Sequence, residues 1–168
     1  MLRSIMKSQL KLICVVAAFA LAFSCAAEEN KAAPVKIIFD TDMDSDCDDV
    51  AALALLHVLA DRGEAEILAT IVSTQNPCSA PCIDAINTFY GRPDLPIGAP
   101  GGAAANRKSK YAEGIATEFP HDLKSTETAA DATELYRDIL SQQPDNSVVI
   151  ATVGYLTNMA NLLKLPAD

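Results

Sequence analysis

The chain has 168 residues, half of them hydrophobic, with 22 acidic and 13 basic residues and a formal net charge of −9. That length suits one domain or part of one, since domains usually contain about 100–200 residues. The acidic surplus and the lack of a basic stripe argue against binding to DNA or RNA polymers and to anionic lipid.

The first 27 residues have the pattern of a secretory signal peptide. Three basic residues precede an apolar run at positions 12–23, and small residues follow at 24–27. The run is shorter than the roughly 20 residues that span a bilayer. We therefore expect an exported protein, periplasmic or extracellular, whose mature chain carries 10 basic and 22 acidic residues, a net charge of −12.

Export leaves two alternatives at the cleavage site. Residues 21–24 (LAFS) before Cys25 resemble a bacterial lipoprotein signal, so a lipid anchor at Cys25 competes with plain cleavage near residues 26–27. Membrane association is expected only through that anchor. Cys78 and Cys82, later in the chain, are interpreted as packing residues or at most one local disulfide, because no further ligands complete a zinc pattern.

Residues 28–34 form a polar linker, after which strand and helix patterns alternate to the end of the chain. Strands are predicted over residues 35–39, 67–73, 95–98 and 147–153, and helices over 48–62, 80–90, 129–142 and 156–164. Residues 103–128 are weakly patterned and are predicted to be a loop with at most a turn of helix. The alternation predicts an α/β fold with a mostly parallel sheet and helices on both faces.

Residues 40–49 (DTDMDSDCDD) hold six aspartates directly after the first predicted strand. In parallel sheets, functional groups gather at this carboxyl edge. Two like charges about 4 Å apart repel by roughly 4 kcal/mol at an effective dielectric constant near 20, so the crowding favours a bound cation. Calcium is favoured over magnesium because it accepts roughly six to eight oxygens in flexible geometry. A solvated acidic turn that caps the next helix is the alternative.

Two other acidic motifs fit this loop less well. An EF-hand needs glycine at its sixth position and glutamate at its twelfth, and neither register within residues 40–53 supplies them. A haloacid-dehalogenase-type phosphatase begins with a similar strand and an Asp-x-Asp pair, but Asp44 stands where Thr or Val is usual. That phosphatase is kept as the weakest alternative function.

Several ordered motifs together resemble the nucleoside hydrolase family, whose members include inosine- and uridine-preferring enzymes. They are the segments 37–42 (IIFDTD), 48–56 (DDVAALALL), 69–76 (ATIVSTQN), 84–98 (DAINTFYGRPDLPIG) and 149–158 (VIATVGYLTN). The resemblance implies that residues 35–168 are the amino-terminal portion of such a domain. It also implies that family's Rossmann-like core, incomplete in this chain.

The resemblance implies a role for each matching residue. Asp42 is similar to the metal ligand that orients and deprotonates the attacking water, Asp49 to the bidentate ligand, and Val153 to the residue whose main-chain carbonyl binds the metal. Asp48 would hold a ribose hydroxyl and Asn76 would contact the sugar. The implied activity is hydrolysis of the N-glycosidic bond of a small-molecule ribonucleoside by a calcium-held water.

Two departures from the family pattern bear on these expectations. The loop is longer than the common family form, so we expect Asp44 or Asp46 to add a ligand or to narrow the pocket. The family's later motifs, an asparagine on the sugar and a histidine–aspartate pair, have no counterpart before Asp168, so this chain alone is expected to be impaired. The alternatives are a non-catalytic, calcium-dependent ribosyl-binding module and a homo-oligomer that completes the site.

The two histidines are assigned different roles. His57 lies among the apolar positions of the first predicted helix and is interpreted as a hydrogen-bonded core or edge residue. His121 lies in the weakly patterned loop, where packing and an approach to the site are alternatives. For Thr157 and Asn158 the resemblance implies a structural role in shaping the loop and the start of the last helix, which is consistent with residue types that favour caps and turns.

Overall fold

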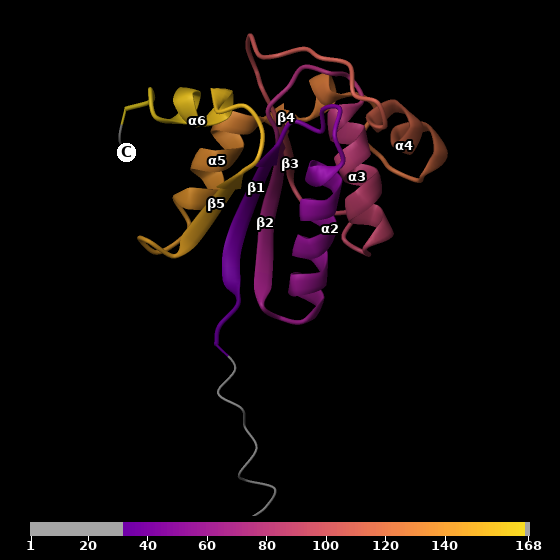
Figure 1. The fold of residues 1–168 in the computed structure, drawn as a ribbon. Coiled ribbons are helices and arrows are strands. Elements are labelled where there is room, and N and C mark those ends of the chain that lie inside the picture. Colours follow the sequence, from indigo (N-terminus) through magenta and orange to yellow (C-terminus); the bar gives the residue numbers. More distant parts are fainter. Residues whose placement is uncertain (1–31, 167–168) are drawn as a thin grey trace, which may run out of the picture. The chain divides into compact units, whose positions relative to one another are not determined.

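The computed structural model describes residues 32–166. The predicted signal peptide (residues 1–27) lies outside this part of the chain, so the signal peptide, the linker at residues 28–34 and the domain limits stay predictions. None of the helices in the described part has the length and apolar content that a membrane crossing requires. Figure 1 shows, in chain order, the elements β1 (Val35–Thr41), α2 (Asp48–Asp61), β2 (Ala65–Val72), α3 (Ser79–Phe89), β3 (Ile97–Ala99), α4 (Ala112–Glu118), the 3-10 helix η1 (Thr126–Thr128), β4 (Ala130–Asp131), α5 (Ala132–Leu140), β5 (Val148–Thr152) and α6 (Thr157–Leu162).

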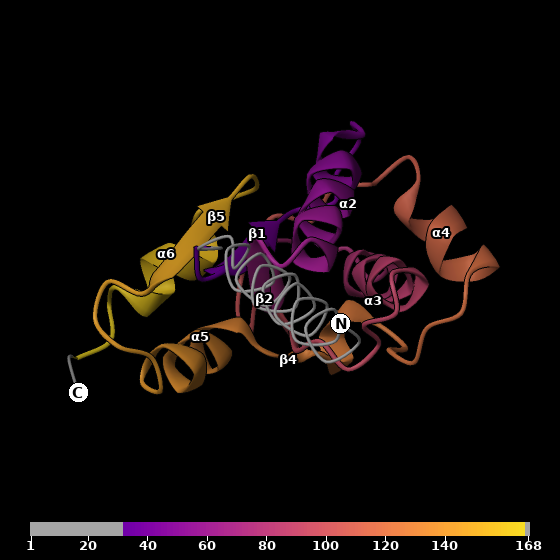
Figure 2. The same ribbon diagram turned by 90° about the horizontal axis from the view of Figure 1, so that it is seen from below.

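The five strands form one sheet in the order β4-β3-β2-β1-β5, and every pairing is parallel. Helices α2 and α3 lie on one side of the sheet and α5 on the other, as Figure 2 shows along the strands. This confirms the predicted α/β class. In the register of the central strands, Asp40 of β1 is level with Ile71 of β2 and with Thr152 of β5, so these three strands end together at one edge.

The core lies on both faces of β1, because successive side chains of a strand point to opposite sides. Phe39 packs with Leu53 of α2 in one apolar cluster, whereas Ile38 packs with Tyr136 of α5 in the other. Each fully buried side chain of this size contributes about 1.5–3 kcal/mol relative to an exposed one. The rigid centre of the sheet therefore carries the loop that follows Thr41.

The structure adds two helices to the segment that was predicted to be mostly loop. α4 has seven residues and η1 has three. Ala112 of α4 is fully buried and Ile115 packs against the core, so α4 is stabilised by tertiary packing. The segment after α4 is fixed by Asp84 of α3, whose Oδ2 accepts the main-chain N–H groups of Asp122 and Leu123, both at 2.8 Å.

The predicted helix over residues 129–142 begins later than expected. Residues 130–131 instead pair with β3 as the edge strand β4. Asp131 then caps α5, since its Oδ1 accepts the main-chain N–H groups of Thr133 at 2.8 Å and Glu134 at 3.1 Å. An aspartate in this position satisfies helix N–H groups that have no partner within the helix.

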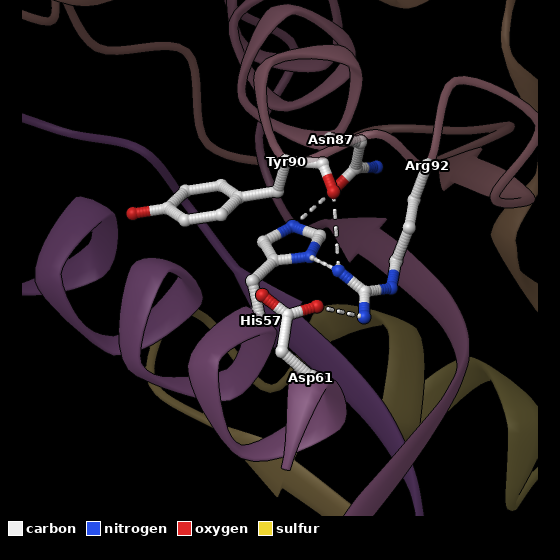
Figure 3. A network of polar contacts seen from close by, with 5 residues as sticks. All are labelled: His57, Asp61, Asn87, Tyr90 and Arg92. Atoms are coloured by element: carbon white, nitrogen blue, oxygen red, sulfur yellow. Dashed lines mark hydrogen bonds and ion pairs between the residues drawn. The ribbon is translucent and has the colours of Figure 1, made fainter. Parts of the chain in front are cut away.

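His57 lies near the end of α2, fully buried within the polar network of Figure 3. Its Nε2 lies 3.0 Å from Asn87 Oδ1, and its Nδ1 lies 3.4 Å from Nη1 of Arg92, which also forms an ion pair with Asp61. The ring stacks on Tyr90 with 4.7 Å between centroids. Because a guanidinium only donates, Nδ1 accepts and Nε2 donates, as in the neutral imidazole. The interpretation of His57 as a hydrogen-bonded core residue is confirmed.

Acid should destabilise the fold through His57. Burial lowers the pKa of this histidine below its usual value of 6.5, so its stabilising contribution is complete above about pH 6.5 and is lost as the pH falls further. We expect the free energy of unfolding in urea to fall more between about pH 7.5 and 5.5 for the wild type than for His57→Gln, which does not titrate. The same pH dependence in both proteins would contradict this role.

Candidate functional site

The acidic loop, residues 40–49, turns sharply after β1 and leads directly into α2. Met43 has a φ of +49° and is fully buried, so the turn is fixed by a side chain that is packed into the core. Positive φ is uncommon for residues other than glycine, so the packing around Met43 must hold its backbone in this conformation. The Thr41 hydroxyl donates to Asp49 Oδ1 and accepts the main-chain N–H of Met43 at 3.3 Å. Thr41 thus joins the two ends of the loop.

Three carboxylates of the loop lie close together. Asp46, Asp48 and Asp49 each offer an oxygen atom, and these atoms lie within 4.8 Å of one another. Asp49 is 3% exposed, whereas Asp46 and Asp48 are exposed. A set of hard oxygen donors at this spacing fits a divalent cation such as calcium or magnesium. The acidic cluster therefore has the composition and spacing of a metal site.

Electrostatics around the acidic cluster agree with that assignment. Burial raises the pKa of Asp49 to about 6, the hydrogen bond from Thr41 opposes the shift, and the charges of Asp42, Asp48 and Asp46 add to it. The pKa of Asp42 is also raised, first by burial, whereas the main-chain N–H of Asp44 lowers it. A cation among these carboxylates would offset their mutual repulsion.

Asp42 lies next to the cluster, where three loops meet. Its Oδ1 accepts the main-chain N–H of Asp44 at 3.0 Å, and its main-chain carbonyl accepts the hydroxyls of Thr74 at 3.4 Å and Ser79 at 3.3 Å. On the β5 side, Gly154 approaches so closely that a Cβ there would lie 2.6 Å from the Asp42 nitrogen. The loops after β1, β2 and β5 thus contact one another at this residue.

The structure places Asn76 and Val153 at the same edge. The side chain of Asn76 donates to the carbonyl of Arg107 at 2.9 Å and accepts the main-chain N–H of Cys78 at 3.0 Å. The main-chain N–H of Val153 donates to the Asp40 carbonyl at 2.8 Å, while its side chain is 48% exposed. Their roles in sugar contact and metal coordination stay predictions.

One buried polar network was not predicted. Asp40 is 1% exposed, and its Oδ2 accepts the Tyr136 hydroxyl at 2.9 Å and Asn158 Nδ2 at 3.1 Å. Asn158 Nδ2 also donates to the Val72 carbonyl at 2.8 Å, so its side chain ties α6 to β2, whereas no side chain caps the start of α6. Burial raises the pKa of Asp40 to about 6, against the two hydrogen bonds. The network joins α5 and α6 to the base of the acidic loop.

Cys78, Cys82 and His121 take no part in the acidic cluster. Cys78 and Cys82 are free and Cys82 is fully buried, which agrees with their interpretation as packing residues and not with a local disulfide. His121 Nε2 lies 2.6 Å from the Ala116 carbonyl of α4. The contact ties His121 to its own neighbouring helix.

The fold and the acidic edge define an α/β protein with a candidate metal site. No protein-family model and no curated protein sequence matches the chain. Its fold is similar to the crystal structure of the effector protein XOO4466, with a TM-score of 0.60 and 14% identity over 79% of this chain and 39% of that one. It is also similar to an inosine-uridine preferring nucleoside hydrolase from Bacillus anthracis, with a TM-score of 0.58 and 17% identity over 76% of this chain and 44% of that one.

At these identities the similarity shows the fold alone. It agrees with the resemblance that the sequence motifs indicate. The chain spans about two fifths of the length of both solved structures, which were matched over 39% and 44% of their residues. The activity of a whole nucleoside hydrolase is therefore a proposal for this chain.

The close approach at Gly154 gives a test of the loop arrangement. A Cβ there would lie 2.5 Å from Ser73 Oγ, so Gly154→Ala should lower the free energy of unfolding in urea by about 1–3 kcal/mol. Gly102→Ala is the matched control, because its Cβ would meet nothing within 4 Å, and its effect should stay within about 0.5 kcal/mol. Equal effects would show that the loops are not packed as described.

The raised pKa of Asp49 predicts a pH-dependent metal affinity. A carboxylate binds a cation in its ionised form, so the affinity for calcium, measured by titration calorimetry, should fall as the pH drops through about 6. Asp49→Asn should weaken binding most above about pH 6 and should reduce this pH dependence. Glu66→Gln removes an exposed carboxylate at the opposite end of β2 and should leave binding unchanged. Calcium binding that is insensitive to both pH and Asp49→Asn would place the cation elsewhere.

Proposed function

We propose that this chain forms the metal- and ribose-binding part of a hydrolase that cleaves the N-glycosidic bond of a ribonucleoside. The observation that carries the proposal is the cluster of Asp46, Asp48 and Asp49 at the carboxyl edge of a parallel sheet whose fold is similar to a nucleoside hydrolase. A fold alone supports many activities, so the argument rests on these side chains.

Calcium is the proposed ion. Its flexible coordination suits a loop whose ligands include exposed, adjustable side chains such as Asp46. When bound, calcium would orient the ribose diol and acidify the attacking water. The extra loop length that distinguishes this sequence from the common family form then supplies a ligand, Asp46, in place of a glycine-containing turn.

Asp42 is the proposed general base. It is half-buried, and burial raises the pKa of its carboxylate toward the neutral range in which a base works best. The main-chain N–H of Asp44 holds its Oδ1, which fixes the orientation of the carboxylate. Thr74, which follows β2, and Ser79, the first residue of α3, hold its main-chain carbonyl, so the base is positioned by the β2–α3 connection as well as by its own loop.

The proposed sugar contacts come from Asp48 and Asn76. Asp48 is exposed at the first turn of α2, where its carboxylate is available to a ribose hydroxyl. Asn76 uses one of its two side-chain N–H groups on the Arg107 carbonyl, which leaves the second for a sugar hydroxyl. Val153 completes the proposed set with a main-chain carbonyl toward the cation.

A non-catalytic, calcium-dependent ribosyl-binding module is the second candidate. One observation favours it, because neither histidine of the chain is placed to protonate a leaving base. His57 is held by Asn87 and Arg92 within the core, and His121 is bonded to the Ala116 carbonyl. Three further expectations are kept as proposals for either candidate: a homo-oligomer, export to the periplasm or the extracellular space, and a lipid anchor at Cys25.

Ribose release from inosine and uridine tests the hydrolase. In line with the impairment expected for this chain alone, we expect slow release that calcium supports and a chelator abolishes. Asp42→Asn should lower its rate by about 10²–10⁴-fold at calcium concentrations that saturate the variant. Glu66→Gln serves again as the control, with an unchanged rate. Calcium and ribose binding without turnover would favour the binding module. No uptake of any divalent cation would refute both candidates.

A further inference from the structure

A short basic segment, residues 107–110 (RKSK), lies on the edge that carries the acidic loop. It belongs to the connection between β3 and α4, which arches over the carboxyl ends of the strands in Figure 1. Asn76 Nδ2 donates to the Arg107 carbonyl at 2.9 Å, and Ser109 Oγ donates to the Asp44 carbonyl at 2.7 Å. The basic segment is thus bonded to the proposed sugar contact on one side and to the acidic loop on the other.

The three cations of the basic segment form no ion pair with any residue that the structure describes. Arg107, Lys108 and Lys110 are exposed, and in the described part of the chain the ion pair within 4.0 Å joins Arg92 to Asp61, at another place in the fold. Ser109, in the same segment, donates to the Asp44 carbonyl, so the segment lies on the edge of the aspartates without an ion pair to them in the described part of the chain. The charge of the three cations is therefore available to a ligand.

The ligand that these charges suit is an anion. The three basic side chains would repel a cation, so they do not serve the metal. A neutral nucleoside has no group that needs three positive charges. A phosphate group would be repelled by the aspartates of this edge unless basic side chains offset them. Arginine and lysine bind phosphate oxygens through charge-assisted hydrogen bonds. The basic segment supplies both residue types within four positions.

We propose that the basic segment is a phosphate subsite, and that the site takes a phosphorylated ribosyl compound such as a nucleoside 5′-phosphate. The proposal rests on the proposed function, because the ribose position is defined by the acidic loop and Asn76. The bond between Asn76 and the Arg107 carbonyl links the sugar contact to the phosphate contact. The alternative is that the basic segment only balances the charge of the acidic loop and contacts no ligand.

Titration calorimetry with ribose and ribose 5-phosphate in the presence of calcium tests the phosphate subsite, since the two probes differ only in the phosphate. We expect ribose 5-phosphate to bind the full chain at least tenfold more tightly than ribose. The combined variant Arg107→Gln/Lys108→Gln/Lys110→Gln should reduce that ratio below about twofold and leave ribose affinity unchanged. A matched control, Lys36→Gln/Lys124→Gln/Lys164→Gln, removes the same net charge elsewhere and should keep the ratio.

Five outcomes would overturn the inference. Equal affinity for the two probes would do so while leaving the ribose site intact. A ratio that survives the triple substitution would place the phosphate elsewhere. Ribose 5-phosphate binding that a chelator does not weaken, or that inorganic phosphate matches, would show anion capture without the ribose site. Failure of both probes to bind in the presence of calcium would refute the proposed function, and the phosphate subsite with it.

Discussion

Repulsion among carboxylates is the constraint on which this edge of the protein depends. Six aspartates lie within ten residues, and the fold keeps them there with specific donors. The Thr41 hydroxyl donates to Asp49, the main-chain N–H of Asp44 donates to Asp42, and Asp40 accepts from helices on the far side of the sheet. Burial nevertheless raises the pKa of both Asp40 and Asp49 to about 6. A divalent cation is the group that would complete this balance.

The sheet fixes where those charges meet. Parallel strands end at one edge, and the register sets Asp40 level with Thr152 of β5. Gly154 then allows the loop after β5 to approach the nitrogen of Asp42, where a side chain would collide. Loops from three strands therefore share one small region. This convergence would let the acidic loop, Asn76 and the Val153 carbonyl act on the proposed ligand.

Opposite charges share the edge without pairing. The aspartates gather around the start of α2, and the basic segment is joined to this edge by hydrogen bonds to main-chain carbonyls, with no ion pair to an aspartate among the described residues. Such a separation suits a ligand with two kinds of group, hydroxyls that share a cation with carboxylates and an anion that needs basic partners. A phosphorylated ribosyl compound has both. Because the protein as a whole is acidic, it repels anions over most of its surface. The basic segment is where an anion gains favourable electrostatic energy.

The sequence by itself determined the α/β class, the acidic loop and the core position of His57, because hydrophobic periods of two and about 3.6 residues are local properties. Only the tertiary structure decided which aspartates come together. It also decided that α4 forms and that β4 replaces the start of a helix, since both depend on contacts with β3 and the core. Asp40 and Tyr136 are 96 positions apart, and Asn76 and Arg107 are 31 apart. Contacts over such separations follow from the packing of whole elements, which no local pattern encodes.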